Sequence, residues 1–174
     1  TPRLPSALTH NSFDFLAQGG VSRWESMPGV KVCGFTITTE RGITNKLTAL
    51  RPAKFIITLL AEKTGRYNCR YGIAIDNALG ISVARIFSPT DSFSCAEGDV
   101  HKVEILFNPL QIGPGEYTVG ISVMDSTPLE QLNNACRYDL ISRSFSFTVE
   151  LPDSLSILSG SILHSCEWAF SPLK

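Results

Sequence analysis

The sequence has few charged residues, and neither sign of charge gathers in one stretch. Asp, Glu, Lys and Arg make up 18% of the 174 residues and leave a formal net charge of −1, whereas an average domain carries roughly 25% charged residues. Nucleic-acid-binding surfaces are usually basic, so we expect no nucleic-acid partner. No apolar run approaches the ~18 residues of a membrane-spanning helix, and no signal peptide is visible at the N-terminus.

The sequence also lacks the short motifs that mark common catalytic sites. Neither a phosphate-cradling Gly-x-x-x-x-Gly-Lys-Ser/Thr loop nor a Gly-x-Ser-x-Gly nucleophile turn occurs. The histidines His10, His101 and His164 lie far apart, and we interpret them as ordinary surface or strand residues, although a folded sheet could still join distant metal ligands. No spacing places two carboxylates as the acid and base of a glycosidase. We therefore expect no enzyme activity, no cofactor and no metal in this chain.

Cysteine is present in an odd number and at wide spacings. No Cys-x-x-Cys pair occurs, which argues against a zinc ribbon or a thioredoxin-like site. Disulfide-stabilised secreted domains are short and rich in cysteine, and this chain is neither. The simpler interpretation is a set of free thiols in a reducing, cytoplasmic compartment. The five are Cys33, Cys69, Cys95, Cys136 and Cys166.

What the sequence does contain is alternation of apolar and polar residues with a period of two, which is typical of β-strands. The segment 76–80, Asp-Asn-Ala-Leu-Gly, suits a tight hairpin turn, because these residues tolerate a left-handed backbone. The segment 125–139 is expected to be a loop with one helical turn at 128–132. The expected strands are 30–38, 55–60, 70–75, 81–87, 99–107, 116–124, 145–149 and 161–168.

About eight strands separated by turns predict an all-β fold, an antiparallel β-sandwich of the jelly-roll or immunoglobulin-like kind. A length of 174 residues suits one such domain. We assign residues 1–22 to a linker or N-terminal extension and 23–174 to the sandwich, with a C-terminal strand at 161–170. Because the first residue is Thr rather than Met, we expect either a fragment of a longer protein or a processed mature chain.

The candidate binding site is one face of the expected sheet. Small and polar residues alternate there with the core residues, which leaves room for a polar ligand. Arg70 and Arg85 share this face, with Arg85 beside Gly72 in the simplest hairpin register, and Thr118 and Ser122 add hydroxyl groups. The planar donors of arginine suit hydroxyl, carboxylate or phosphate oxygens. The alternative is a plain solvated face, which antiparallel sheets show routinely.

Trp24 and Trp168 leave a similar choice open. An exposed indole can stack on a sugar ring, whereas a tryptophan beside a strand more often packs in the core. We place Trp168 among the candidate carbohydrate-binding residues, with packing at a subunit boundary as its alternative role.

The order of these features resembles the C-terminal domain of Wzt, the nucleotide-binding subunit of ABC transporters that export O-antigen polysaccharides in Gram-negative bacteria. The resemblance covers residues 20–170. It is carried by the hairpin 71–83, the Gly-x-Tyr strand start in 110–121, the strand 145–149 and the closing segment 160–168.

The resemblance implies a non-catalytic domain that binds the O-antigen polysaccharide, often at its modified non-reducing end. It implies a homodimer, with possible exchange of the C-terminal strand that carries Trp168, and contact with the transmembrane subunit through the parent chain. ATP and Mg²⁺ would bind a separate N-terminal domain, and the location would be the cytoplasmic face of the bacterial inner membrane. The family fixes no shared set of binding residues. The alternative function is a structural or protein-interaction sandwich of the immunoglobulin type, without sugar binding.

Overall fold

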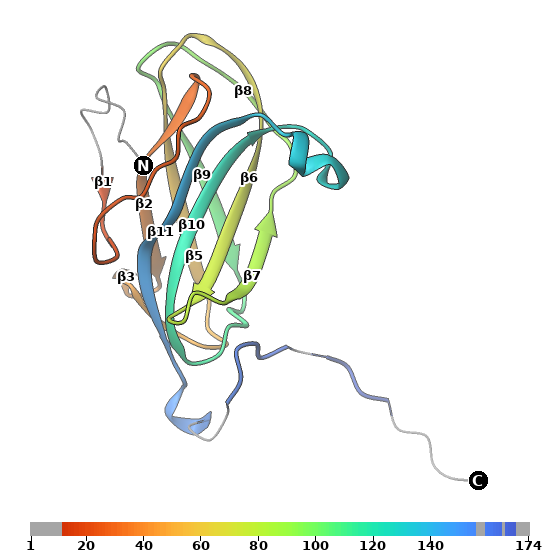
Figure 1. Ribbon diagram of the computed structural model, residues 1–174. Helices are drawn as coiled ribbons and strands as arrows, with labels where there is room; N and C mark the ends of the chain where they lie inside the picture. Colours follow the sequence, from red (N-terminus) through yellow and green to blue (C-terminus); the bar gives the residue numbers. More distant parts are fainter. Residues whose placement is uncertain (1–11, 156–158, 165, 170–174) are drawn as a thin grey trace.

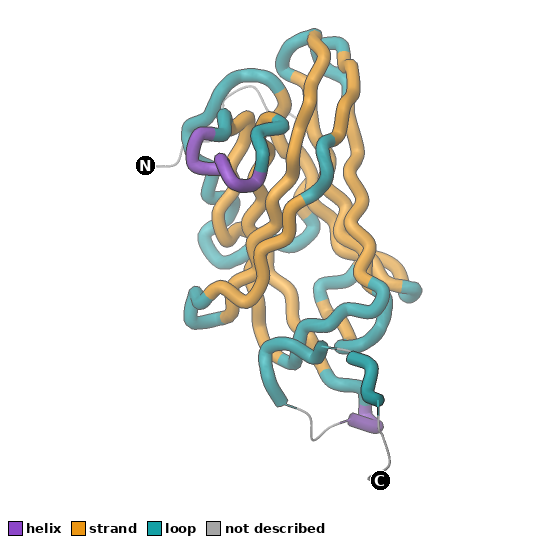
Figure 2. Tube along the Cα trace, turned by 90° about the vertical axis from the view of Figure 1, so that its right-hand side faces the viewer, coloured by secondary structure: helices purple, strands orange, loops and turns teal. Residues whose placement is uncertain are grey.

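Two β-sheets pack face to face in the computed structural model, which describes residues 12–155, 159–164 and 166–169. In Figure 1 the six-stranded sheet lies in front of the five-stranded sheet, and Figure 2 shows the same strands turned by 90°. Most neighbouring strands are antiparallel, and only the short strands β1 and β4 pair in parallel. The predicted all-β antiparallel sandwich is confirmed.

The five-stranded sheet runs in the order β1-β2-β5-β9, with β3 paired to β2. Its central strand alternates strictly between buried and half-buried residues, as expected for a sheet with one face toward a core. The strands are β1 Ser12–Phe13, β2 Val30–Thr39, β3 Gly42–Ile43, β5 Ala53–Ala61 and β9 Val100–Phe107.

The six-stranded sheet runs in the order β4-β11-β10-β6-β7, with β8 paired to β6. Its strands are β4 Lys46–Thr48, β6 Gly65–Asn77, β7 Ser82–Phe87, β8 Asp91–Cys95, β10 Gly115–Asp125 and β11 Arg137–Glu150. The short 3₁₀ helix η1, Leu129–Asn134, joins β10 to β11, and η2, Asp153–Leu155, follows β11. The helical turn expected at 128–132 is therefore present as η1.

Aromatic rings fill the space between the two sheets. The Phe35 ring stacks on Phe145 at 4.6 Å between centroids, and Phe55 meets Phe147 edge-on at 5.6 Å. All four rings are fully or almost fully buried, and each pair joins the five-stranded to the six-stranded sheet. Side chains alternate between the two faces of a strand. The residues between these core positions therefore lie on the outer faces of the sheets.

The structure differs from the expected strands most at β8, at the start of β11 and at the C-terminal segment. Strand β8 was not expected, and β11 begins at Arg137 rather than at residue 145. The expected last strand at 161–170 does not form as a strand of either sheet among the described residues. Only Ile162 forms an isolated bridge, to Ile112, and in Figure 1 the chain then leads away from the sandwich. Within the described ranges, residues 166–169 have no strand beside them to pair with, and a strand forms only with a hydrogen-bonded neighbour.

The described part of the N-terminal segment, 12–22, is packed on the sandwich rather than free. Phe13, Phe15 and Val21 lie against the core, and β1 pairs with β2. The following segment, 22–27, runs along β11, where the Trp24 amide donates to the Leu140 carbonyl at 2.9 Å. Residues 1–11 of the expected linker or extension lie outside the described residues.

Candidate functional site

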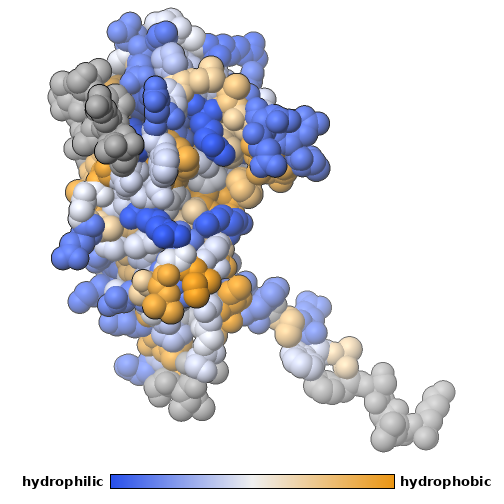
Figure 3. Space-filling view, viewed as in Figure 1, coloured by the Kyte–Doolittle hydropathy of each residue, from blue (hydrophilic) through white to orange (hydrophobic). Residues whose placement is uncertain are grey.

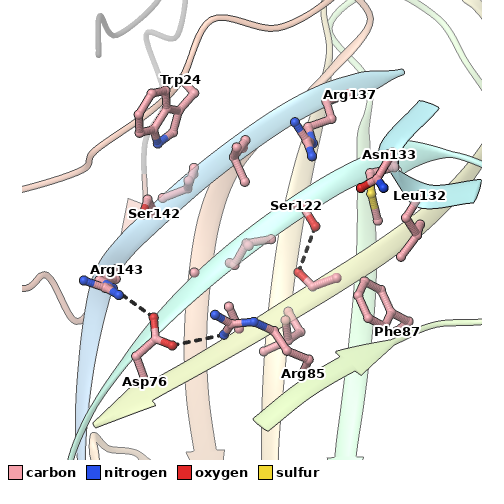
Figure 4. Close-up of a pocket in the computed structure, with 18 residues that line it drawn as sticks. Trp24, Asp76, Arg85, Phe87, Ser122, Leu132, Asn133, Arg137, Ser142 and Arg143 are labelled. Atoms are coloured by element: carbon pink, nitrogen blue, oxygen red, sulfur yellow. Dashed lines mark hydrogen bonds and ion pairs between the residues drawn. The ribbon is translucent and has the colours of Figure 1, made fainter. Parts of the chain in front are cut away.

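A groove of about 460 Å³ lies on the outer face of the six-stranded sheet, across β6, β10 and β11. Figure 4 looks into it, with β7 at one side and Trp24 at the other. The residues that project outward along its floor are small: Gly72, Ala74, Gly120, Ser122 and Ser142. The groove exists because these five floor positions carry almost no side-chain volume.

Two of these floor positions leave little room for a side chain. A Cβ atom at Gly72 would overlap Ser122 Oγ and lie 3.1 Å from the Phe87 ring. A Cβ atom at Gly120 would lie 3.1 Å from the Ile141 carbonyl oxygen. The first contact involves a hydroxyl that can rotate, whereas the second involves backbone. A side chain at Gly120 would therefore press on the backbone of β11, whereas a side chain at Gly72 would make the groove shallower.

A carboxylate at one end of the groove holds two arginines. Asp76 Oδ1 lies 3.1 Å from Arg85 Nη1, and Asp76 Oδ2 lies 3.0 Å from Arg143 Nε, as the dashed lines in Figure 4 show. Arg143 Nη2 also donates to the Gly80 carbonyl at 2.8 Å. The three residues come from β6, β7 and β11, so this cluster ties the β6–β7 hairpin to β11.

A bulge in β11 aims Arg143 across the sheet. Val119 pairs with Phe145 and Ile121 pairs with Ile141, so three residues of β11 stand opposite Gly120. Arg143 has φ 44°, a left-handed backbone that is uncommon for a non-glycine residue. Bulges redirect side chains and are frequent beside functional sites, and strained backbone is likewise concentrated at such sites.

Aromatic side chains form two rims of the groove. Trp24 is 54% exposed and Phe87 is 38% exposed, and both line the groove from opposite sides. Trp24 therefore does not pack in the core, as a tryptophan beside a strand usually does. Exposed aromatic faces of this size are suited to stacking on a flat, partly apolar ligand such as a sugar ring.

A buried ionic cluster positions the Trp24 rim. Arg23 Nε lies 3.1 Å from Asp139 Oδ1, and Asp139 Oδ2 accepts from the Val32 amide at 2.8 Å. Lys31 Nζ donates to Ser26 Oγ at 2.8 Å. Burial lowers the pKa of Arg23, and the Asp139 carboxylate opposes that shift.

The other end of the groove is closed by η1 and the start of β11. Leu132 and Asn133 come from η1, Met124 from the end of β10, and Arg137 from the first position of β11. Arg137 is exposed, and Figure 4 shows it beside Asn133, away from the Asp76 cluster. The groove is thus elongated, with an arginine at each end.

Two of the five candidate residues line this groove, and three do not. Arg85 and Ser122 are lining residues, although Arg85 pairs with Ala74 rather than with Gly72 as expected. Arg70 is not among the lining residues and donates instead to the Ser88 carbonyl at 2.9 Å. Thr118 shares the face and pairs with Asp76, but it is not among the lining residues. Trp168 is 78% exposed and is not among the lining residues.

Few patterns along the chain point to the other groove residues. Asp76 was interpreted as a turn residue, but the turn belongs to Asn77, whose Oδ1 accepts from the amides of Leu79 and Ile81 at 3.0 and 2.9 Å. Arg143 and Arg137 lie in β11, before the segment expected as a strand. Only the alternation of Gly72 and Gly120 with core residues pointed to a bare sheet face.

Two features are absent from the part of the chain that the structure describes: a cluster of metal ligands and a helix able to cross a membrane. No three His, Cys, Asp or Glu side chains gather there as metal ligands. None of its helices has the length and apolar character needed to cross a membrane.

One solved structure among those similar to this chain agrees with its fold over nearly its whole length. The crystal structure of the C-terminal domain of Wzt superposes with a TM-score of 0.69 at 18% identity, covering 88% of this chain and 90% of that one. A Pseudomonas fluorescens alkylpurine DNA glycosylase, AlkC, reaches 0.45 at 15% identity, over 70% of this chain and 30% of that one. The CARDB domain of a Pyrococcus furiosus protein reaches 0.39 at 10% identity, over 85% and 100%. The curated proteins contain no match. The family model of the Wzt C-terminal domain matches residues 22–162, and the chain belongs to this family.

Proposed function

We propose that this domain is a non-catalytic carbohydrate-binding module that recognises O-antigen polysaccharide for export by an ABC transporter. The observation that carries the proposal is the groove on the six-stranded sheet. Its floor is made of small residues, its rims carry Trp24 and Phe87, and its ends carry arginine donors. Aromatic faces together with a few fixed polar groups are the usual features of a ligand-binding cleft. Membership of the Wzt C-terminal domain family supports the transporter context.

Binding, rather than bond cleavage, suits the residues of the groove. Glycoside hydrolysis needs two carboxyl groups on opposite sides of the bond. Among the described residues, Asp76 is the one acidic side chain that lines the groove, and both of its oxygens are held by arginines. The arrangement can hold hydroxyl groups and ring faces, and it offers no acid–base pair.

The partners in this proposal follow the family. The domain would act as a homodimer and reach the transmembrane subunit through the parent chain, at the cytoplasmic face of the inner membrane, while ATP and Mg²⁺ bind elsewhere in that parent. The C-terminal segment supports a dimer contact, because Ile162 and Trp168 are 58% and 78% exposed in the isolated chain. We assign Trp168 to this subunit boundary rather than to the groove.

A protein-interaction domain is the second candidate function. The turn between β6 and β7 exposes Leu79 at 83% and Ile81 at 59%, and Figure 3 shows an apolar patch at this place. Exposed apolar patches often mark protein contacts. This candidate predicts no affinity for any polysaccharide.

A binding titration separates the two functions. The domain is titrated by calorimetry with the purified O-polysaccharide of the strain that encodes it, and with an O-polysaccharide of an unrelated serotype. Saturable binding of its own polymer alone supports recognition for export. Failure of the folded domain to bind either polymer supports the protein-interaction function instead.

A further inference from the structure

The Asp76 end of the groove carries more positive than negative charge. Arg85 and Arg143 share one carboxylate, and one carboxylate cannot neutralise two guanidinium groups. The Asp76 side chain is 3% exposed, whereas those of Arg85 and Arg143 are 46% and 55% exposed. The negative charge is therefore buried beneath the groove, and the excess positive charge faces solvent.

Both arginines keep hydrogen-bond donors that no described residue uses. Arg85 bonds through Nη1, which leaves Nε and Nη2, and Arg143 bonds through Nε and Nη2, which leaves Nη1. An arginine carries five N–H donors in a rigid plane. Asp76 and the Gly80 carbonyl together hold the Arg143 guanidinium, and Asp76 holds that of Arg85, so the remaining donors are presented at this end of the groove without a ligand.

The Arg23–Asp139 pair differs from the Asp76 cluster, because it is buried and serves only to hold the fold together. Arg23 and Asp139 are 1% and 0% exposed and pair one to one. Asp139 also accepts from the Val32 and Leu140 amides at 2.8 and 2.9 Å. That pair is buried away from solvent, whereas the two arginines of the Asp76 cluster are 46% and 55% exposed and remain open to a ligand.

The rest of the groove adds positive charge and no compensating acid. Arg137 lies at the far end, and its guanidinium has no hydrogen bond or ion pair to any residue in the described ranges. The residues that line the groove include three arginines and one aspartate, a formal charge of +2. The whole chain, by contrast, has a formal net charge of −1.

We propose that the groove selects an anionic sugar, a polysaccharide unit that bears a carboxylate or a phosphate group. Arg85 and Arg143 donate to its anionic oxygens, because guanidinium groups match carboxylate and phosphate geometry, and Trp24 or Phe87 stacks on its ring. This inference rests on the proposed carbohydrate-binding function and names the chemical class of the ligand. The left-handed backbone of Arg143 is then retained because it places a donor of the anion site.

The test compares three forms of the strain's own O-polysaccharide in calorimetric titrations. One is untreated, one has its carboxyl groups reduced to alcohols, and one has its phosphate esters removed. We expect affinity to fall about ten- to a hundredfold in one treated form, because that form no longer makes a charge-assisted hydrogen bond with the arginines. The form that loses affinity identifies the anion as carboxylate or phosphate. Binding of the untreated form should also weaken as salt is raised.

Variants locate the effect in the groove. Arg85→Gln and Arg143→Gln should bind the untreated polymer as weakly as the treated polymer, and Arg85→Lys, which keeps the charge but not the planar donors, should recover part of the affinity. Arg66→Gln is the matched control, because Arg66 is an exposed arginine on β6 that does not line the groove. Its binding should equal that of the unmodified domain.

The outcomes distinguish this inference from the function on which it rests. Equal affinity for all three forms would overturn the anionic-sugar inference and leave polysaccharide binding intact. Binding of polyglutamate as tight as that of the untreated polymer would overturn it too, because charge alone would then suffice. Absence of binding to every form would overturn the proposed function itself.

Discussion

At the scale of single residues, the groove depends on the missing side chain of Gly72. In a Gly72→Ala variant the new methyl group would displace the Ser122 hydroxyl and press on Phe87 at 3.1 Å. We expect polysaccharide affinity to fall about tenfold while the free energy of unfolding changes by about 1 kcal/mol or less, because the hydroxyl can rotate away. Calorimetry and urea unfolding measure the two effects.

The same substitution at Gly65 is the control. Gly65 also lies in β6, but a Cβ atom there meets only the Tyr67 side chain, at 3.5 Å or more. Gly65→Ala should leave affinity unchanged. Equal loss of affinity in both variants would show that the methyl group acts through β6 as a whole and not through the groove floor.

Sequence patterns predicted the residues of the sheet face better than the residues of the groove. Arg85 and Ser122 could be placed because alternation within β6, β7 and β10 assigns each residue to a face. Arg143 could not be placed, because a bulge shifts the alternation of β11 at that point. The partnership of Asp76 with two arginines depends on three strands, and no spacing along the chain encodes it.

At the scale of elements, the buried Arg23–Asp139 pair holds segment 22–27 against β11. An Asp139→Asn change leaves the Arg23 charge buried without its counter-ion, which typically costs about 3–5 kcal/mol. We expect a loss of that size in urea unfolding, together with weaker binding, because Trp24 follows Arg23 in the chain. The ion pair Lys54–Glu104 serves as the control for this substitution, because its side chains are 36% and 55% exposed.

In the Glu104→Gln variant the loss of an exposed ion pair should cost less than about 1 kcal/mol. If Asp139→Asn were no more destabilising than Glu104→Gln, the segment 22–27 would be held by its backbone hydrogen bonds alone, and the ionic cluster would have no positioning role.

The C-terminal segment shows where prediction from sequence fails at the element scale. Alternation in 161–168 resembles a strand, yet strand formation also requires a neighbour, and alternation says nothing about neighbours. Within the described residues, this part of the chain makes two backbone hydrogen bonds with 111–113, from Gly113 N to the Ser161 carbonyl and from Leu163 N to the Gln111 carbonyl. Residues 166–168 of this pattern have no such partner in the described part of the chain, which fits the subunit contact proposed above.

At the scale of the whole molecule, buried thiols and phenols make the fold sensitive to high pH. Burial raises the pKa of Cys69 from 9.0 to about 12, and burial and the Asp91 hydrogen bond raise that of Tyr71. Above pH 9 the unfolded chain releases protons that the folded chain keeps. The free energy of unfolding should therefore fall as pH rises from 9 to 12, by up to about 1.4 kcal/mol per pH unit for each such group.

Urea unfolding at several pH values from 8 to 11 measures this slope. A Cys69→Ala variant should show a shallower decline, whereas Cys136→Ala, at an exposed position, should keep the original slope. Parallel curves for the unmodified protein and Cys69→Ala would contradict the assignment of Cys69 to the buried core.

The central claim is that a polysaccharide occupies the groove beside Trp24, and Trp24 can report on it directly. The chain has two tryptophans, so in a Trp168→Phe variant all tryptophan fluorescence comes from the groove rim. Titration of this variant with the strain's own O-polysaccharide should change the emission of Trp24 saturably, and an unrelated polymer should not. A saturating calorimetric signal with no change in Trp24 emission would place the sugar elsewhere on the domain and contradict the groove as its site.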